Sequence, residues 1–213
     1  MSEKGMFDIS DLEGVLARVA DRLDDSFTGV FSKETIQRYV SESYELLAKN
    51  ATVTVHLPSL TERFAKDRLR ALAQHEAKID KEMPSILFVC VHNAGRSQMA
   101  AALATKLSSG RVEVRSAGSA PSESIPSNVH SAMQEIGLSL EEAFPKPLTD
   151  EVVRASDVVI TMGCGDACPI YPGKRYEDWT LDDPSELDLH GVKLVRDEIS
   201  ERISKLLSEM DII

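Results

Sequence analysis

The chain has 213 residues, of which 42% are hydrophobic and 28% are charged, and its formal net charge at pH 7 is -11. This length allows one large hydrophobic core or two small ones. The negative charge argues against sequence-independent binding to nucleic acid or anionic membranes, because both require basic patches. Three cysteines cannot all pair within one chain, and no apolar run reaches the length of a signal peptide or membrane span. We therefore expect a cytoplasmic protein with reduced thiols and neither nucleic-acid nor membrane partners.

The first part of the chain, residues 1–82, has the pattern of three amphipathic helices. Apolar residues recur at helical spacing in three successive segments. Ser10 and Ser59 each begin a capping-box sequence, and Ser32 precedes the second segment. The run Thr52–Val55 alternates in polarity, as a short strand or an extended connector would. Three such helices in about 80 residues predict a small helical bundle.

The second part, residues 83–213, alternates between apolar runs and helical patterns. The expected strands are Ile86–Val91, Val112–Ser116, Asp157–Met162 and Arg175–Trp179. The expected helices are Ser97–Leu107, Ser127–Ile136, a short one after Thr149, and Val192–Met210. This alternation predicts an α/β domain, a four-stranded parallel sheet with helices on both faces. Ligands of such sheets bind beyond the carboxyl ends of the strands, where Cys90 lies.

A loop joins the first expected strand to the helix that follows it. Its sequence is Cys90-Val91-His92-Asn93-Ala94-Gly95-Arg96-Ser97. Backbone N–H groups gathered at a helix N-terminus bind an oxyanion and stabilise a thiolate. Arg96 can hold two oxyanion oxygens in a fixed fork, Ser97 can donate to the thiolate, and Asn93 can hold the loop's shape. We expect Cys90 to attack a phosphate-like oxyanion bound by residues 91–97. The alternative is that Cys90 is only a small buried residue that ends a core strand.

Two further cysteines, Cys164 and Cys168, follow the third expected strand in a loop that contains glycine and proline. Zinc needs four ligands, and no Cys-x2-Cys or nearby histidine pair supplies the others, so we expect no metal ion. We favour a redox pair over structural thiols. With Cys90, the chain then holds one nucleophile, one thiol that resolves it and one that carries the disulfide outward.

Asp183 precedes a proline and therefore lies in an extended or turn conformation, which can hold its carboxyl group over a site. A departing oxygen needs a proton, and a carboxylic acid can donate one. From these residues alone, a solvated surface turn is the simpler interpretation.

These features occur in one order along the chain. They are Cys90-x5-Arg96-Ser97, the turn Ser116-Ala117-Gly118, the pair Cys164 and Cys168, and Asp183-Pro184. In these motifs and their order, the chain resembles the thioredoxin-coupled arsenate reductases, which are built on the low-molecular-weight tyrosine phosphatase fold. The resemblance covers about residues 84–211.

The resemblance implies a role for each of these residues. Cys90 attacks arsenate, Arg96 and the loop amides hold the oxyanion, and Asp183 protonates the departing hydroxyl. Cys164 then attacks Cys90, which releases arsenite and leaves a disulfide between the two. Cys168 takes over that disulfide, and thioredoxin reduces it. The implied enzyme reduces arsenate to arsenite with no bound cofactor, and thioredoxin supplies the reducing equivalents.

The chain departs from the family pattern at two places. Only three residues separate Cys164 from Cys168, whereas the gap is often longer in the family. Ala101 stands where some members carry an acidic residue that binds potassium, so we do not carry that site over.

The rival interpretation is a low-molecular-weight tyrosine phosphatase that uses Cys90, Arg96 and Asp183. Ser185 and Glu186 argue against it, because such phosphatases usually carry aromatic residues there that grip a phenyl ring.

Residues 1–82 resemble the small bundle that precedes the catalytic domain in a subset of these reductases. They hold 12 Lys and Arg against 15 Asp and Glu, a net charge of -3, with no basic recognition helix. We therefore expect residues 1–82 to form an interface rather than a DNA-binding module. A homodimer through the bundle is one form that this interface could take.

Overall fold

The structure is a computed structural model that describes residues 9–163 and 168–213. The chain divides into two compact units, the first ending at Ile79 and the second beginning at Asp80. Cys164, one of the residues singled out above, lies outside the described residues. Within the described ranges, the helices contain no segment with the length and hydropathy needed to cross a membrane.

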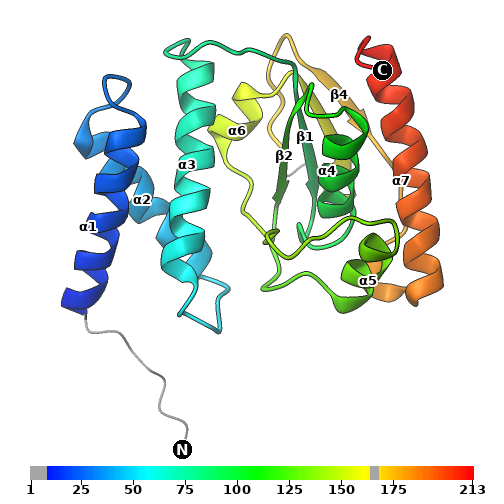
Figure 1. Ribbon diagram of the computed structural model, residues 1–213, viewed down its shortest axis with the longest axis horizontal. Helices are drawn as coiled ribbons and strands as arrows, with labels where there is room; N and C mark the ends of the chain where they lie inside the picture. The colour runs from blue at the N-terminus through cyan, green and yellow to red at the C-terminus, as the bar shows by residue number, and fades with distance from the viewer. Residues whose placement is uncertain (1–8, 164–167) are drawn as a thin grey trace, which may run out of the picture. The chain divides into compact units, whose positions relative to one another are not determined.

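The first unit is a three-helix bundle, which confirms the expected helical region (Figure 1). Its helices are α1 (Ile9–Ser26), α2 (Lys33–Ala48) and α3 (Leu57–His75), and each contacts the other two. Their apolar stripes face one another, as amphipathic helices require. The buried residues that form this small core are Val19, Ala20, Leu23, Phe27, Ile36, Tyr39, Val40, Ala65 and Leu69.

The helix boundaries differ in part from those expected. Ser32 is the N-cap of α2 and accepts a hydrogen bond from the Thr35 N–H, at 3.3 Å. The capping box at Ser59 is wrong, since α3 already begins at Leu57 with a proline in its first turn, a position that suits the fixed φ of proline. Ser10 likewise lies inside α1. The alternating run after α2 forms no strand and is a connector.

The second unit is built on a four-stranded, fully parallel sheet, as expected. Its strands are β1 (Ser85–Cys90), β2 (Glu113–Gly118), β3 (Val158–Met162) and β4 (Arg175–Asp178), in the spatial order β2-β1-β3-β4. All six residues of β1 are buried. The register pairs Cys90 with Gly118 of β2 and with Met162 of β3, so the carboxyl ends of three strands meet around Cys90.

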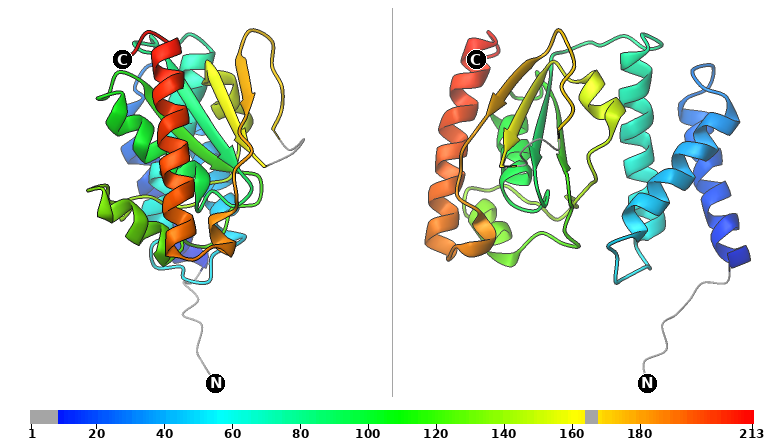
Figure 2. Two further views of the ribbon diagram at one scale, coloured as in Figure 1. Left: turned by 90° about the vertical axis from the view of Figure 1, so that its right-hand side faces the viewer. Right: turned by 180° about the vertical axis from the view of Figure 1, so that it is seen from behind.

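Helices cover both faces of this sheet, which confirms the expected fold class. They are α4 (Arg96–Leu107), α5 (Ser127–Glu135), α6 (Asp150–Ala155) and α7 (Leu189–Glu209). In Figures 1 and 2, α6 lies on one face, whereas α4, α5 and α7 lie together on the other. One continuous apolar core fills the latter layer, with Phe88, Met99 and Ile199 fully buried in it. Because the core fixes both β1 and α4, it also fixes the loop that joins them.

Candidate active site

Cys90 is the last residue of β1, and its side chain is almost fully buried, at 2% exposed. Its Sγ lies 3.0 Å from the Ser97 hydroxyl and accepts the Asn93 backbone N–H at 3.2 Å. The Ser97 oxygen already accepts a hydrogen bond from the Asn93 amide, at 2.8 Å, so its own proton is available to the sulfur. Both donors therefore stabilise negative charge on Cys90.

Asn93 is the centre of the hydrogen-bond network that shapes the loop. Its backbone has φ +46°, a left-handed conformation that asparagine tolerates better than most residues. Its buried side-chain oxygen accepts the Lys146 backbone N–H at 2.8 Å and the Gln98 amide at 3.1 Å. Gln98 also donates to the Phe144 carbonyl at 2.9 Å. The loop is thus held from α4 and from the segment after α5 before any ligand binds.

Gly118, the last residue of β2, lets the loop approach the sheet closely. A Cβ atom at this position would lie 2.8 Å from the Val91 carbonyl oxygen and 2.9 Å from the Asn93 backbone N. Real Cβ atoms do not come so close to backbone atoms, so the observed loop position requires glycine here.

Arg96, the first residue of α4, is buried beside the loop and reaches toward the segment after β4. Its Nη2 lies 2.5 Å from Asp183 Oδ2, and its Nη1 donates to the Leu181 carbonyl at 3.2 Å. Gly163, at the end of β3, has φ +75°, and a Cβ there would lie 3.2 Å from Arg96 Nη1. The guanidinium therefore lies between the carboxyl end of β3 and the Asp183 segment, beside the loop that follows Cys90.

Asp183 is held as a carboxylate. Its Oδ1 accepts the Ser185 backbone N–H at 3.0 Å and the Ser185 hydroxyl at 2.8 Å, which caps the short 3-10 turn Pro184–Glu186. Partial burial on its own raises the pKa of Asp183. The hydrogen bonds from Ser185 and the positive charges of Arg96 and His92 outweigh burial, and the pKa lies below its ordinary value.

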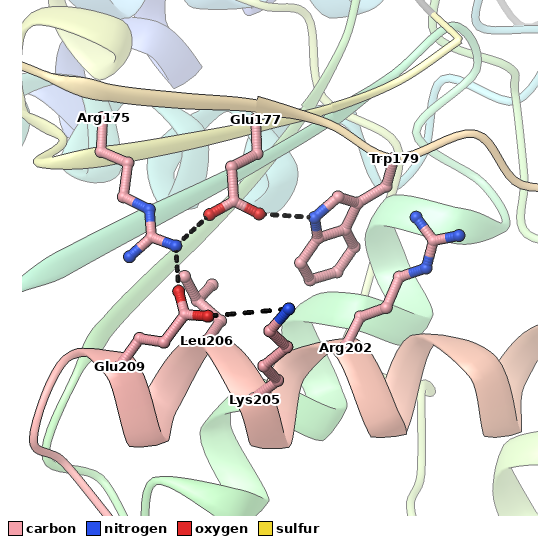
Figure 3. Close-up of a pocket in the computed structure, with 7 residues that line it drawn as sticks. All are labelled: Arg175, Glu177, Trp179, Arg202, Lys205, Leu206 and Glu209. Carbon is pink, nitrogen blue, oxygen red and sulfur yellow. Dashed lines mark hydrogen bonds and ion pairs between the residues drawn. The ribbon is translucent and has the colours of Figure 1, made fainter.

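Trp179 anchors the strand that leads to Asp183. Its ring is buried against Phe88 of β1, with 6.0 Å between the ring centroids. Figure 3 shows its Nε1, which donates to Glu177 at 2.8 Å. Arg202 of α7 donates to the Thr180 carbonyl at 3.1 Å. These contacts tie Trp179 to β1 and Thr180 to α7 and so limit where Asp183 can lie.

A groove of about 410 Å³ lies between β4 and α7 (Figure 3). It is lined by Arg175, Glu177, Trp179, Arg202, Lys205, Leu206 and Glu209. Several of the charged side chains in this lining form ion pairs with one another, since Arg175 pairs with both Glu177 and Glu209. The lining includes neither the Cys90 loop nor Asp183, so we treat the groove as part of the supporting wall.

Cys168 is the first described residue of the segment that leads to β4. It is buried, at 8% exposed. Its Sγ lies 3.9 Å from the Pro169 carbonyl oxygen. Its expected partner Cys164 lies outside the described residues. Among the residues that the structure describes, no three His, Cys, Asp or Glu side chains gather as a metal site would need.

The structure thus brings Cys90, Asn93, Arg96, Ser97 and Asp183 together at the carboxyl edge of the sheet. Two supporting residues were missed in the sequence. Gln98 is a buried amide that directly precedes the apolar run Met99–Ala104 of α4, and such a polar residue is a usable signal. Ser185 follows Asp183-Pro184, and an aspartate before a proline commonly caps a turn by accepting the N–H two residues on, so the backbone bond had a usable signal whereas the hydroxyl bond had none.

This arrangement, a buried thiol in a hydrogen-bonded loop with an arginine and an aspartate beside it, is that of a phosphatase-like enzyme. The chain belongs to the low molecular weight phosphotyrosine protein phosphatase family, whose sequence pattern it matches over residues 85–212. Residues 16–73 match the family described as protein-tyrosine-phosphatase-like, N-terminal domain.

Similar proteins include several arsenate reductases. The solved thioredoxin-dependent arsenate reductase of Corynebacterium glutamicum is 50% identical, with a TM-score of 0.84, over 93% of this chain and 97% of its own. The putative arsenate reductase of Halobacterium salinarum is 34% identical over 58% of this chain and 91% of its own length. The glutaredoxin arsenate reductase of Synechocystis is 32% identical over 60% of this chain and 99% of its own length. The first of these similarities extends through both units.

Proposed function

We propose that this chain is an arsenate reductase in which Cys90, Cys164 and Cys168 act in turn and thioredoxin restores the dithiol. The observation that carries the proposal is the buried Cys90 sulfur, which receives hydrogen bonds from its loop. This loop leads directly into α4, whose first residue is Arg96. The 50% identity to a thioredoxin-dependent arsenate reductase along nearly the whole chain supports the choice of substrate.

In the first step, arsenate binds to the amides of residues 91–97 and to the fork of Arg96. Arg96 turns from Asp183 to the oxyanion, and the loss of this cation beside a new anion raises the pKa of Asp183 until it carries a proton. The Cys90 thiolate attacks arsenic, and a sulfur–arsenic bond forms. An arsenic–oxygen bond breaks, and the oxygen leaves as water with the proton from Asp183.

In the second step, the Cys164 thiolate attacks the Cys90 sulfur. A disulfide forms, the sulfur–arsenic bond breaks, and its electron pair stays on arsenic, which leaves as arsenite. Cys168 then attacks Cys164, which yields a Cys164–Cys168 disulfide and returns Cys90 as a thiolate. The dithiol of thioredoxin supplies two electrons to reduce this disulfide. A phosphoryl group on Cys90 could not accept these electrons and would be hydrolysed instead.

The rival phosphatase activity would use the same Cys90, Arg96 and Asp183. Ser185 and Glu186 are both exposed polar residues, so this segment offers no aromatic wall for a phenyl ring. The phosphatase reading also leaves Cys164 and Cys168 without a role. We therefore do not favour it.

Arsenate-dependent NADPH oxidation with thioredoxin and thioredoxin reductase tests the proposal. We expect Cys90→Ser and Cys164→Ser to form no arsenite. Cys168→Ser should form about one arsenite per chain and stop with a Cys90–Cys164 disulfide, which mass spectrometry can map. A parallel assay with glutaredoxin and glutathione decides the reductant. Wild-type turnover by Cys164→Ser would overturn the mechanism.

For the first unit we propose an interface, in the form of a homodimer through the bundle. The supporting observation is the connector before α3, where Val53 and Val55 are 59% and 69% exposed. Sedimentation of the full chain tests it. We expect a dimer for the wild type and a monomer for the double variant Val53→Asp, Val55→Asp, and a monomeric wild type would refute the proposal.

A further inference from the structure

The hydroxyl group of Tyr176 ties down the segment that follows Cys168. It accepts the backbone N–H of Tyr171 at 2.9 Å and donates to the carbonyl of Pro169 at 3.3 Å. One side chain thus holds the backbone on both sides of Ile170, whose own side chain is 82% exposed. Tyr176 is itself fixed, because it lies within β4, paired with Val159 of β3.

The bond to Pro169 reaches Cys168 directly. The Pro169 carbonyl oxygen that accepts the Tyr176 hydroxyl also lies 3.9 Å from the Cys168 sulfur. Burial raises the pKa of Tyr176, and the charge that Cys168 carries as a thiolate raises it further, as expected for neighbouring groups. The position of the thiol is therefore coupled to the position of this hydroxyl.

The same segment is held at a second point. The Tyr171 hydroxyl donates to Asp150 of α6, and the Arg154 guanidinium lies 4.3 Å from the centroid of the Tyr171 ring. The chain after Cys168 is thus bonded to β4 through backbone groups and to α6 through a side chain. Of these contacts, those of Tyr176 are the nearer to the sulfur along the chain.

We propose that Tyr176 is a positioning residue that presents Cys168 for thiol–disulfide exchange, an inference that rests on the proposed function. In that exchange the Cys168 thiolate attacks the Cys164 sulfur, the Cys164–Cys168 bond forms, the Cys90–Cys164 bond breaks, and Cys90 leaves as a thiolate. The attacking sulfur must lie in line with the bond that breaks. The rate of the exchange therefore depends on how firmly the backbone around Cys168 is held. Without the hydroxyl, Pro169 and Tyr171 lose their shared partner, and Cys168 samples unproductive orientations.

The first test is a single turnover of arsenate by Tyr176→Phe without reductant, quenched with an alkylating agent. Arsenite release should stay within about twofold of wild type, because both hydrogen bonds of the hydroxyl go to the segment after Cys168. Conversion of Cys90–Cys164 to Cys164–Cys168 should slow about tenfold. Tyr44→Phe, the same change in α2, is the control and should alter neither rate. Conversion at the wild-type rate, or equal slowing of both steps, would overturn the proposal.

The second test needs no arsenate. In a Cys90→Ser, Cys164→Ser background, Cys168 is the remaining cysteine of the chain, and iodoacetamide reports its accessibility. Adding Tyr176→Phe should raise the alkylation rate by about threefold or more, since the buried thiol is released toward solvent. An unchanged rate would count against Tyr176. Circular dichroism confirms that the variant folds. If the wild type makes no arsenite, the proposed function fails, and the alkylation rate still decides the role of Tyr176.

Discussion

Arg96 and Asp183 hold each other across the candidate site, with 2.5 Å between Nη2 and Oδ2 and with 9% and 29% of their side chains exposed. In the proposed reaction one binds the oxyanion and the other donates a proton. The hydrogen bonds from Ser185 and the ion pair with Arg96 both favour the ionised form of Asp183. In the proposed reaction the second of these contributions is lost when the oxyanion draws Arg96 away. This relationship makes oxyanion binding and protonation of Asp183 interdependent.

The depressed pKa of Asp183 predicts a pH-dependent contribution to stability. A carboxyl group whose pKa is lower in the folded chain stabilises the fold above its unfolded pKa, about 3.9, and loses this contribution as the pH falls through the folded value. We expect Asp183→Asn to lower the free energy of unfolding at neutral pH, and the difference to shrink below about pH 4. Urea unfolding measures it, with the exposed Asp182→Asn as control. A difference independent of pH would contradict the lowered pKa of Asp183.

Asp183→Asn should also separate binding from chemistry. The amide keeps the shape of the side chain but cannot give up a proton, so we expect arsenite formation in a single turnover to fall about 100-fold. Inorganic phosphate should still bind within a few-fold of wild type, since Arg96 is then free of its carboxylate partner. Rapid-quench kinetics and calorimetry measure the two quantities. A variant that forms arsenite at the wild-type rate would remove Asp183 from the mechanism.

Arg96→Lys tests the fork geometry. Lysine keeps the charge but cannot hold two oxygens at fixed positions, so we expect phosphate to bind at least about tenfold more weakly. Titration calorimetry measures the dissociation constant. Arg111→Lys is the matched control, because Arg111 is exposed and bonds the Ser108 carbonyl outside the loop. Equal affinities for all three chains would show that Arg96 does not bind the oxyanion.

Gly118→Ala tests the close approach of β2 to the loop. The added Cβ meets the Val91 carbonyl and Asn93 at under 3 Å, so the loop must shift, at a cost of about 1–3 kcal/mol and with loss of phosphate binding. Gly110→Ala is the control. Gly110 has φ +74° and nothing within 4 Å, so that change should cost about 1 kcal/mol through backbone strain and leave phosphate binding intact. Intact binding in Gly118→Ala would mean that the loop tolerates the shift.

The order of strands and helices could be predicted from the period of the apolar residues. The strand β1 covers Ser85–Cys90, which is the expected range Ile86–Val91 shifted by one residue. The expected bundle has the three helices α1, α2 and α3. Helix starts were harder to predict, because caps depend on single contacts. Asp188 accepts the Gly191 N–H at 2.8 Å and caps α7, which begins at Leu189, three residues before the expected Val192.

The amino-acid sequence alone was enough to predict the candidate site residues and the edge of the sheet where Cys90 lies, because strand, loop and helix are encoded by neighbouring residues. The contacts between residues far apart in the chain became visible in the folded structure. Arg96 meets Asp183 across 87 positions, and Gln98 meets the Phe144 carbonyl across 46. Such contacts depend on how helices pack on the sheet, which no local pattern records. These contacts place an arginine, an ionised aspartate and a loop of fixed shape around the Cys90 thiol.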